Sequence, residues 1–62
     1  MTTDQKYLLE TIRRLASEVA EARRSAEGKV SEETLEDVEF VQERVELLAE
    51  SLETKFERQT SA

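Results

Sequence analysis

Glutamate recurs through the second half of this 62-residue chain in alternating steps of three and four residues. The series is Glu36, Glu39, Glu43, Glu46, Glu50, Glu53 and Glu57. Such steps return side chains to one side of an α-helix, because the helix turns once every ~3.6 residues. Valine and leucine keep the same rhythm on the opposite side. The pattern predicts a long amphipathic helix whose acidic side chains form its solvent face.

The first half of the chain has the same apolar rhythm, and it begins with a helix-start signal. Thr2 and Gln5 have the spacing of a capping box, in which each side chain binds the backbone N–H of the other residue. Asp4 suits the positive end of the helix dipole. We therefore expect a first helix over residues 4–27.

A short turn separates the two helical patterns. Gly28 suits the left-handed position that ends a helix, and Ser31 suits the N-cap of the next helix. We expect a turn over residues 28–31, a second helix over 32–58 and a frayed tail over 59–62. Short connections make antiparallel neighbours, so the whole chain is predicted to be one helical hairpin.

A hairpin of this size needs support from outside itself. Small domains are usually stabilised by disulfides, metals or oligomerisation, and the chain has neither cysteine nor histidine. The predicted fold is therefore all-α, an antiparallel hairpin that dimerises into a four-helix bundle. The predicted dimer core is Leu8, Ile12, Leu15, Val19, Ala22, Ala26, Val38, Val41, Val45, Leu48 and Leu52. The rival arrangement is a hairpin completed by a different helical protein.

Two further apolar residues, Phe40 and Leu47, lie seven apart on another side of the second helix. They are either part of the dimer interface or an exposed strip framed by Arg44 and Ser51. Exposed apolar strips often mark partner sites. Of these two interpretations, the sequence favours the interface.

Charge is divided unevenly between the two helices. The first has five basic and five acidic residues, whereas the second has ten acidic and three basic residues. The whole chain has a net charge of -6. We expect arginines of the first helix to pair with acids of the second across the seam, where each exposed pair contributes only ~0.2–1 kcal/mol.

The layout resembles the Rop family, small plasmid RNA-binding hairpins that dimerise into four-helix bundles. The length is similar, and the core positions of both helices fall on the same register over about residues 1–56. Identical residue types occur at Met1, Thr2, Lys6, Leu9, Arg13, Glu33, Leu48 and Phe56. The resemblance implies a dimeric four-helix bundle.

RNA binding is the function that this resemblance implies, through polar, basic and aromatic side chains on the first helices. The matching positions here are Glu10, Arg14, Glu18 and Ser25, so two of the four are acids. Acids repel phosphates, which disfavours nucleic acid as a partner. An RNA face would have to use Arg13, Arg14, Arg23 and Arg24, and acidic residues lie between these arginines.

Catalysis is not expected, because the chain has no histidine or cysteine and no hydroxyl with a partner base at a recognisable spacing. We predict no metal site and no cofactor. No apolar run is as long as a membrane span, and the start of the chain lacks a secretion signal, so we expect a cytoplasmic protein. The predicted function is a non-enzymatic, homodimeric protein-interaction or regulatory module. The alternatives are a Rop-like RNA-binding regulator and a subunit of a mixed helical assembly.

The acidic side chains of the second helix give a testable prediction about salt. Glu39–Glu43, Glu46–Glu50 and Glu53–Glu57 are like-charge pairs four residues apart. Each pair costs about 0.2–0.5 kcal/mol, and salt screens that repulsion. We expect the melting temperature, followed by circular dichroism, to rise with NaCl concentration. A melting temperature that falls as NaCl increases would contradict this account.

Overall fold

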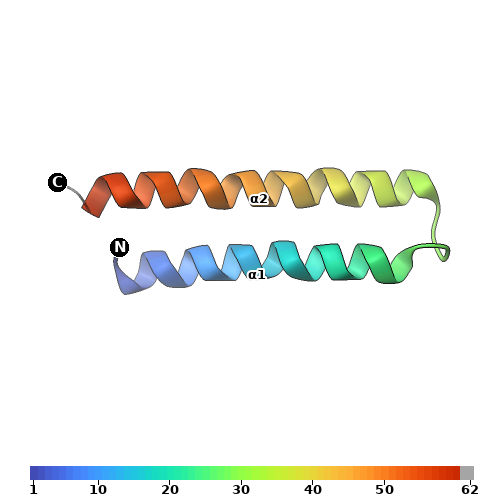
Figure 1. The fold of residues 1–62 in the computed structure, drawn as a ribbon, viewed down its shortest axis with the longest axis horizontal. Helices are drawn as coiled ribbons and strands as arrows, with labels where there is room; N and C mark the ends of the chain where they lie inside the picture. The colour runs from blue at the N-terminus through green and yellow to red at the C-terminus, as the bar shows by residue number, and fades with distance from the viewer. Residues whose placement is uncertain (61–62) are drawn as a thin grey trace.

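The computed structural model describes residues 1–60, with the side chain of residue 60 excluded. It contains helix α1 (Thr3–Ala26) and helix α2 (Glu32–Thr60) and no strand within these residues. Figure 1 shows the helices lying side by side and antiparallel, with both ends of the chain at one end of the hairpin. The Cα trace extends 49 × 16 × 10 Å. The predicted helical hairpin is confirmed.

The start of α1 is a capping box, as predicted. The Oγ1 atom of Thr2 accepts a hydrogen bond from the Gln5 backbone N–H at 3.1 Å, and Gln5 Oε1 accepts one from the Thr2 N–H at 2.9 Å. These two bonds satisfy backbone donors that have no partner within the helix. α1 begins at Thr3 and ends at Ala26, one residue earlier at each end than expected.

The turn is built from a left-handed glycine and a serine cap. Gly28 has a φ of 79°. The N–H groups of Lys29 and Val30 both donate to the Ala26 carbonyl, at 2.9 and 3.3 Å. Ser31 Oγ then accepts from the Thr34 N–H at 3.2 Å. The chain therefore reverses over a few residues, which forces α1 and α2 to pack along their length.

At the open end of the hairpin, α2 extends to Thr60, two residues beyond the expected helix end at Arg58. Gln59 lies within the helix and its Oε1 accepts a hydrogen bond from Gln5 Nε2 at 2.7 Å. The expected frayed tail over 59–62 thus begins in helical residues. Residues 61–62 lie outside the described residues.

The seam between α1 and α2 has a small apolar core. Leu9, Ala16 and Ala49 are its buried residues. Each of them follows a predicted core residue by one position in the sequence, so it lies further round the helix. Leu9 and Ala16, seven residues apart, form one column along α1, and Ala49 belongs to a similar column along α2. The small alanines let the two helices approach closely, and half-buried Leu35 and Phe56 extend the α2 column on either side of Ala49.

The turn gives a testable prediction about Gly28. A Cβ added there meets no heavy atom within 4 Å, so a substitution is disfavoured by the positive φ and not by a clash. We expect Gly28→Ala to lower the free energy of unfolding by about 1 kcal/mol. Urea unfolding followed by circular dichroism measures the change.

Gly28→Asn is the matched control, because asparagine adopts the left-handed region more readily than alanine. It should lose less stability than Gly28→Ala. Equal stability of Gly28→Ala and the unchanged protein would show that the turn does not require a positive φ.

Candidate functional site

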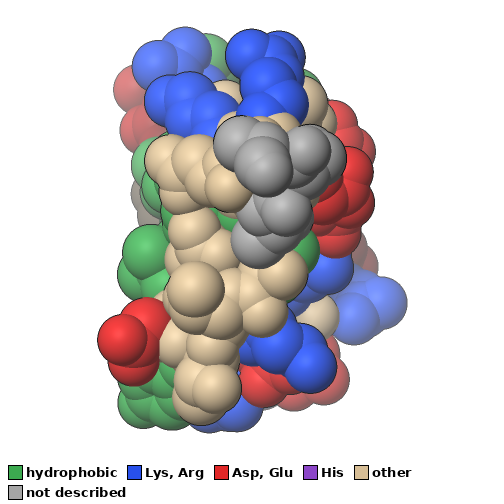
Figure 2. All heavy atoms as spheres, turned by 90° about the vertical axis from the view of Figure 1, so that its left-hand side faces the viewer, with side chains coloured by type: hydrophobic (Ala, Val, Ile, Leu, Met, Phe, Trp, Pro, Cys, Tyr) green, Lys and Arg blue, Asp and Glu red, His purple; other side chains and the backbone are tan. Residues whose placement is uncertain are grey.

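The largest feature left uncovered by the hairpin is an apolar face that runs along both helices. Leu8 and Leu15 on α1, with Val41 and Leu48 on α2, are between 47% and 54% exposed. A second set lies between them and the seam and is half-buried: Ile12, Val19, Ala26, Val38, Val45 and Leu52. With exposed Ala22, these two sets are the eleven predicted core residues, and we call them the apolar face. Figure 2, an end-on view, shows hydrophobic side chains gathered along one side of the hairpin over both helices.

The two halves of the apolar face are in register with one another. The Gln5–Gln59 hydrogen bond sets the level of the two helices at the open end. Counting seven residues inward along each helix places Ile12 level with Leu52, and seven more place Val19 level with Val45. Apolar residues of α1 and α2 therefore form cross-hairpin layers on one continuous surface.

Near the turn, the apolar face is hollowed into a shallow groove. Its lining is Val19, Ala22, Thr34, Asp37, Val38 and Val41. Ala22 and Thr34 have short side chains, so they leave space between the larger valines. Thr34 and Asp37 are the polar members of this lining, and the other four residues are apolar.

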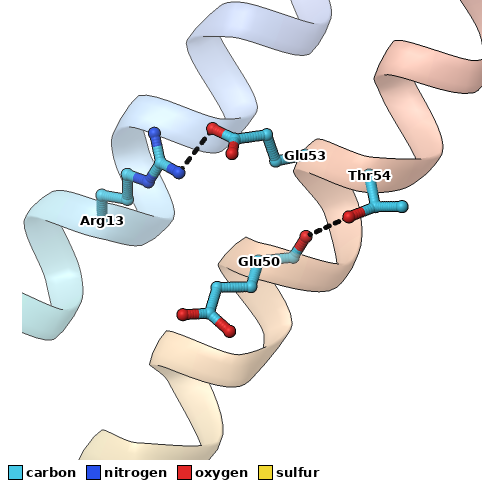
Figure 3. Close-up of polar contacts among 4 residues, drawn as sticks. All are labelled: Arg13, Glu50, Glu53 and Thr54. Carbon is cyan, nitrogen blue, oxygen red and sulfur yellow. Dashed lines mark hydrogen bonds and ion pairs between the residues drawn. The ribbon is translucent and has the colours of Figure 1, made fainter.

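On the other side of the seam, glutamates of α2 meet arginines of α1. Arg13 donates to Glu53 Oε2 at 2.6 Å, and Figure 3 shows this pair bridging the two helices. Arg23 donates to Gln42 Oε1 at 3.3 Å and lies 4.0 Å from Glu39 Oε2. The predicted pairing of arginines with acids across the seam is confirmed.

These contacts correct the expected position of the acidic side chains. The glutamates do not all point away from the hairpin, because Glu39, Glu46 and Glu53 form a column beside the seam. Glu46 accepts a hydrogen bond from Gln42 Nε2 at 3.1 Å, four residues earlier on α2. The remaining four glutamates form a second column further round α2. One of them, Glu50, still borders the shallow groove between the two helices.

The four arginines of the alternative RNA face lie in two different environments. Arg13 and Arg23 are held at the seam by acids and Gln42 of α2. Arg14 and Arg24 are exposed. A shallow polar groove on this side includes Arg13 and Arg24 but also Glu21, Glu46 and Glu50. The arginines therefore do not form a continuous basic surface.

Phe40 and Leu47 are both 61% exposed, more than any of the large residues of the apolar face. The guanidinium carbon of Arg44 lies 5.7 Å from the centre of the Phe40 ring. This is near the outer limit of a cation–π contact, which is weak at an exposed site. The hairpin itself thus leaves more than half of the surface of each of these two residues exposed.

Other kinds of site are not indicated by the described residues. Within residues 1–60, no three Asp or Glu side chains are grouped closely enough to hold a metal ion. Neither helix in that part of the chain combines the length and hydropathy needed to cross a membrane. Comparison with known proteins found no matching family model, curated relative or solved structure.

The Arg13–Glu53 contact gives a testable prediction about the seam. A double-mutant cycle with Arg13→Ala and Glu53→Ala should give a coupling free energy of roughly 0.2–1 kcal/mol, because both side chains are partly solvated. Urea unfolding of the four proteins measures it. The coupling should shrink as NaCl increases, since salt screens exposed charges.

The control cycle pairs Arg24→Ala with Glu53→Ala, because Arg24 lies near the turn, far from Glu53. No coupling is expected there. Equal coupling in the two cycles would mean that Glu53 acts through the general charge of the protein and not through Arg13.

Proposed function

We propose that this protein is a non-enzymatic protein-interaction module whose working form is a homodimer joined through the apolar face. The observation that supports the proposal is the exposure of Leu8, Leu15, Val41 and Leu48 on one continuous side of the hairpin. Exposed apolar surfaces of this kind mark protein–protein contacts. Burying the face against a second copy completes an antiparallel four-helix bundle.

The exposed area supports the need for a partner. The hairpin exposes 4905 Å². A compact monomer of its 7.1 kDa mass exposes about 4,100 Å² by the usual scaling of surface with mass. The excess, about 800 Å², is similar to the area that each partner buries in a typical stable interface.

The small core of the single hairpin also supports the need for a partner. Leu9, Ala16 and Ala49 are the buried hydrophobic residues, and two of them are alanines. Burial of a large aliphatic side chain contributes about 1.5–3 kcal/mol, so such a core contributes little against the conformational entropy lost on folding. Covering the leucines and valines of the apolar face would add the missing stabilisation.

A second copy is the simplest occupant of the apolar face. A two-fold axis places the same face on both partners, and two-fold dimers are the commonest oligomers. The face itself is made of uncharged side chains, so the net charge of -6 on each chain does not have to be buried. A different helical protein with a matching apolar face is the rival occupant.

The structure does not favour RNA binding. Two of the four candidate arginines already contact side chains of α2, and glutamates lie among the others. Neutralising phosphates would require releasing those contacts and bringing Glu46 and Glu50 near the RNA backbone. The homodimer is therefore the arrangement that we propose.

The proposal predicts that a charge on the apolar face separates the dimer. Leu15→Glu and Leu48→Glu each replace a half-exposed leucine, so they disturb the hairpin seam little but place a carboxylate in the proposed interface. Multi-angle light scattering should give twice the 7.1 kDa chain mass for the unchanged protein and a lower mass for both variants. Burying an unpaired charge costs several kcal/mol, enough to raise the dissociation constant at least about a hundredfold.

Tyr7→Glu is the matched control, because Tyr7 is 69% exposed and its side chain points about 100° away from that of Leu8. It should leave the mass unchanged. A folded monomer for the unchanged protein across the accessible concentration range would contradict the proposed dimer. A poorly helical monomer would favour the rival, a hairpin completed by a different protein.

A further inference from the structure

Phe40 and Leu47 lie outside both surfaces that the fold and the proposed dimer account for. Each immediately precedes a residue of the apolar face, Val41 or Leu48, so its side chain points about 100° away from that face. Each also lies two residues before a member of the seam column that contains Ala49, so its side chain points away from α1. Hairpin packing and the proposed dimer therefore both leave this pair exposed.

An acidic column runs beside this pair. Glu36 and Glu43 lie four residues before and three residues after Phe40, and Glu43 and Glu50 have the same relation to Leu47. Such spacings make the side chains neighbours on the helix surface. Within residues 1–60 the carboxylates of these three glutamates have no hydrogen bond or ion pair. We call the two apolar residues and the three glutamates the α2 strip.

The composition of the α2 strip determines which partner would fit it. An apolar pair seven residues apart fits the apolar side of another helix, as in helix-in-groove recognition. Three adjacent unpaired carboxylates favour lysine or arginine next to that apolar side. Phosphates of a nucleic acid would be repelled. We propose that the α2 strip is a docking surface for a basic amphipathic helix of another protein.

A second copy of this chain does not fit the α2 strip. α2 has a net charge of -7 between residues 32 and 58, so two such strips would repel one another. α1 is balanced in charge, and its arginines are interleaved with acids. From Glu36 to Glu50 the α2 strip spans about 21 Å, which corresponds to four turns of a docked helix.

Arg44 separates the α2 strip from the apolar face. It lies four residues after Phe40 and three before Leu47, and its guanidinium is over the Phe40 ring. A docked helix would contact the ring from the side of the glutamates, where no cation competes. The strip therefore has a preferred side for basic residues of the partner.

This inference depends on the proposed function in one respect. The apolar face is larger than the α2 strip and would itself bind an amphipathic helix if no second copy covered it. The test must therefore show where on the protein a probe binds, and must follow the mass of the protein at the same time.

The probe is a synthetic amphipathic helical peptide of about 18 residues, with leucines on one side and lysines and arginines next to them. It is titrated into the full chain labelled with ¹⁵N, and the amide signals are followed by NMR. We expect the shifted signals to group over residues 36–51. A scrambled peptide of the same composition should bind at least about tenfold more weakly, because its leucines no longer share one side.

Two variants test the two parts of the α2 strip. Phe40→Ser with Leu47→Ser should raise the dissociation constant of the peptide at least about tenfold, through loss of apolar contact. The triple variant Glu36→Gln, Glu43→Gln and Glu50→Gln should raise it at least about threefold, through loss of exposed charge pairs.

Matched controls lie on α1. Tyr7→Ser removes an aromatic ring that is slightly more exposed than Phe40. Glu10→Gln, Glu18→Gln and Glu21→Gln together remove three acids. Each control should change the dissociation constant by less than about twofold, since these residues lie on the other helix. An effect of the triple α1 variant equal to that of the triple α2 variant would overturn the proposal.

The outcomes separate this inference from the proposed dimer. Signals that shift over all acidic parts of the chain, or over the apolar face at Leu15 and Leu48, would overturn the α2 strip. If the unchanged protein is a dimer, a monomeric mass for the Phe40→Ser, Leu47→Ser variant would also overturn it, because the pair would then belong to the dimer interface. Shifts confined to residues 36–51 on a monomeric protein would support the strip and contradict the proposed dimer.

Discussion

The hydrophobic contact between α1 and α2 is narrower than the apolar surface that the two helices present, and the other features follow from this mismatch. A two-helix seam covers one column of residues on each helix, here the columns that contain Leu9 and Ala49. The heptad pattern supplies apolar residues to a second column on each helix. Because a hairpin has no third element to pack there, Leu15 and Leu48 remain about half exposed. The hairpin is thus fully formed, but much of its apolar surface is not buried within it.

Charge is arranged around this apolar arc in a way that keeps the two sides of the hairpin different. On one side of the seam, Arg13 and Arg23 neutralise Glu53 and Glu39. On the other side, the apolar face contains no charged group. An ion pair on a solvated surface contributes little stability, and burying it in an interface would cost the hydration of both charges. In the proposed dimer, self-association therefore uses the apolar face, and its free energy would come from apolar burial.

Local features of the fold were predictable from the sequence because each depends on neighbouring residues. The Thr2–Gln5 capping box, the left-handed Gly28 and the Ser31 cap have short-range signals, and the structure contains all three. The choice of seam was less predictable. Leu9–Ala16 and Leu8–Leu15 have the same spacing of seven, so periodicity alone does not show which column faces the neighbouring helix. The buried alanines decide in favour of the first column, since they permit closer packing of the helices.

The positions of the acids and of the candidate sites depended on that same choice. With the seam at Ala16 and Ala49, Glu39 and Glu53 lie beside it, although the sequence suggested that all seven glutamates form one solvent face. The sequence favoured an interface position for Phe40 and Leu47. In the structure this pair is exposed instead, because the seam and the apolar face both lie elsewhere on α2. The role of such a residue depends on which surfaces of the two helices come together. It can therefore be assigned only from the three-dimensional structure.

Isotope-filtered NMR on a mixture of labelled and unlabelled chains would locate the interface of the proposed dimer. It detects contacts between protons of two different copies and ignores those within one copy. We expect intermolecular contacts between the methyl groups of Leu8, Leu15, Val41 and Leu48. No intermolecular contact at millimolar concentration, or contacts confined to Phe40 and Leu47, would contradict a dimer joined through the apolar face.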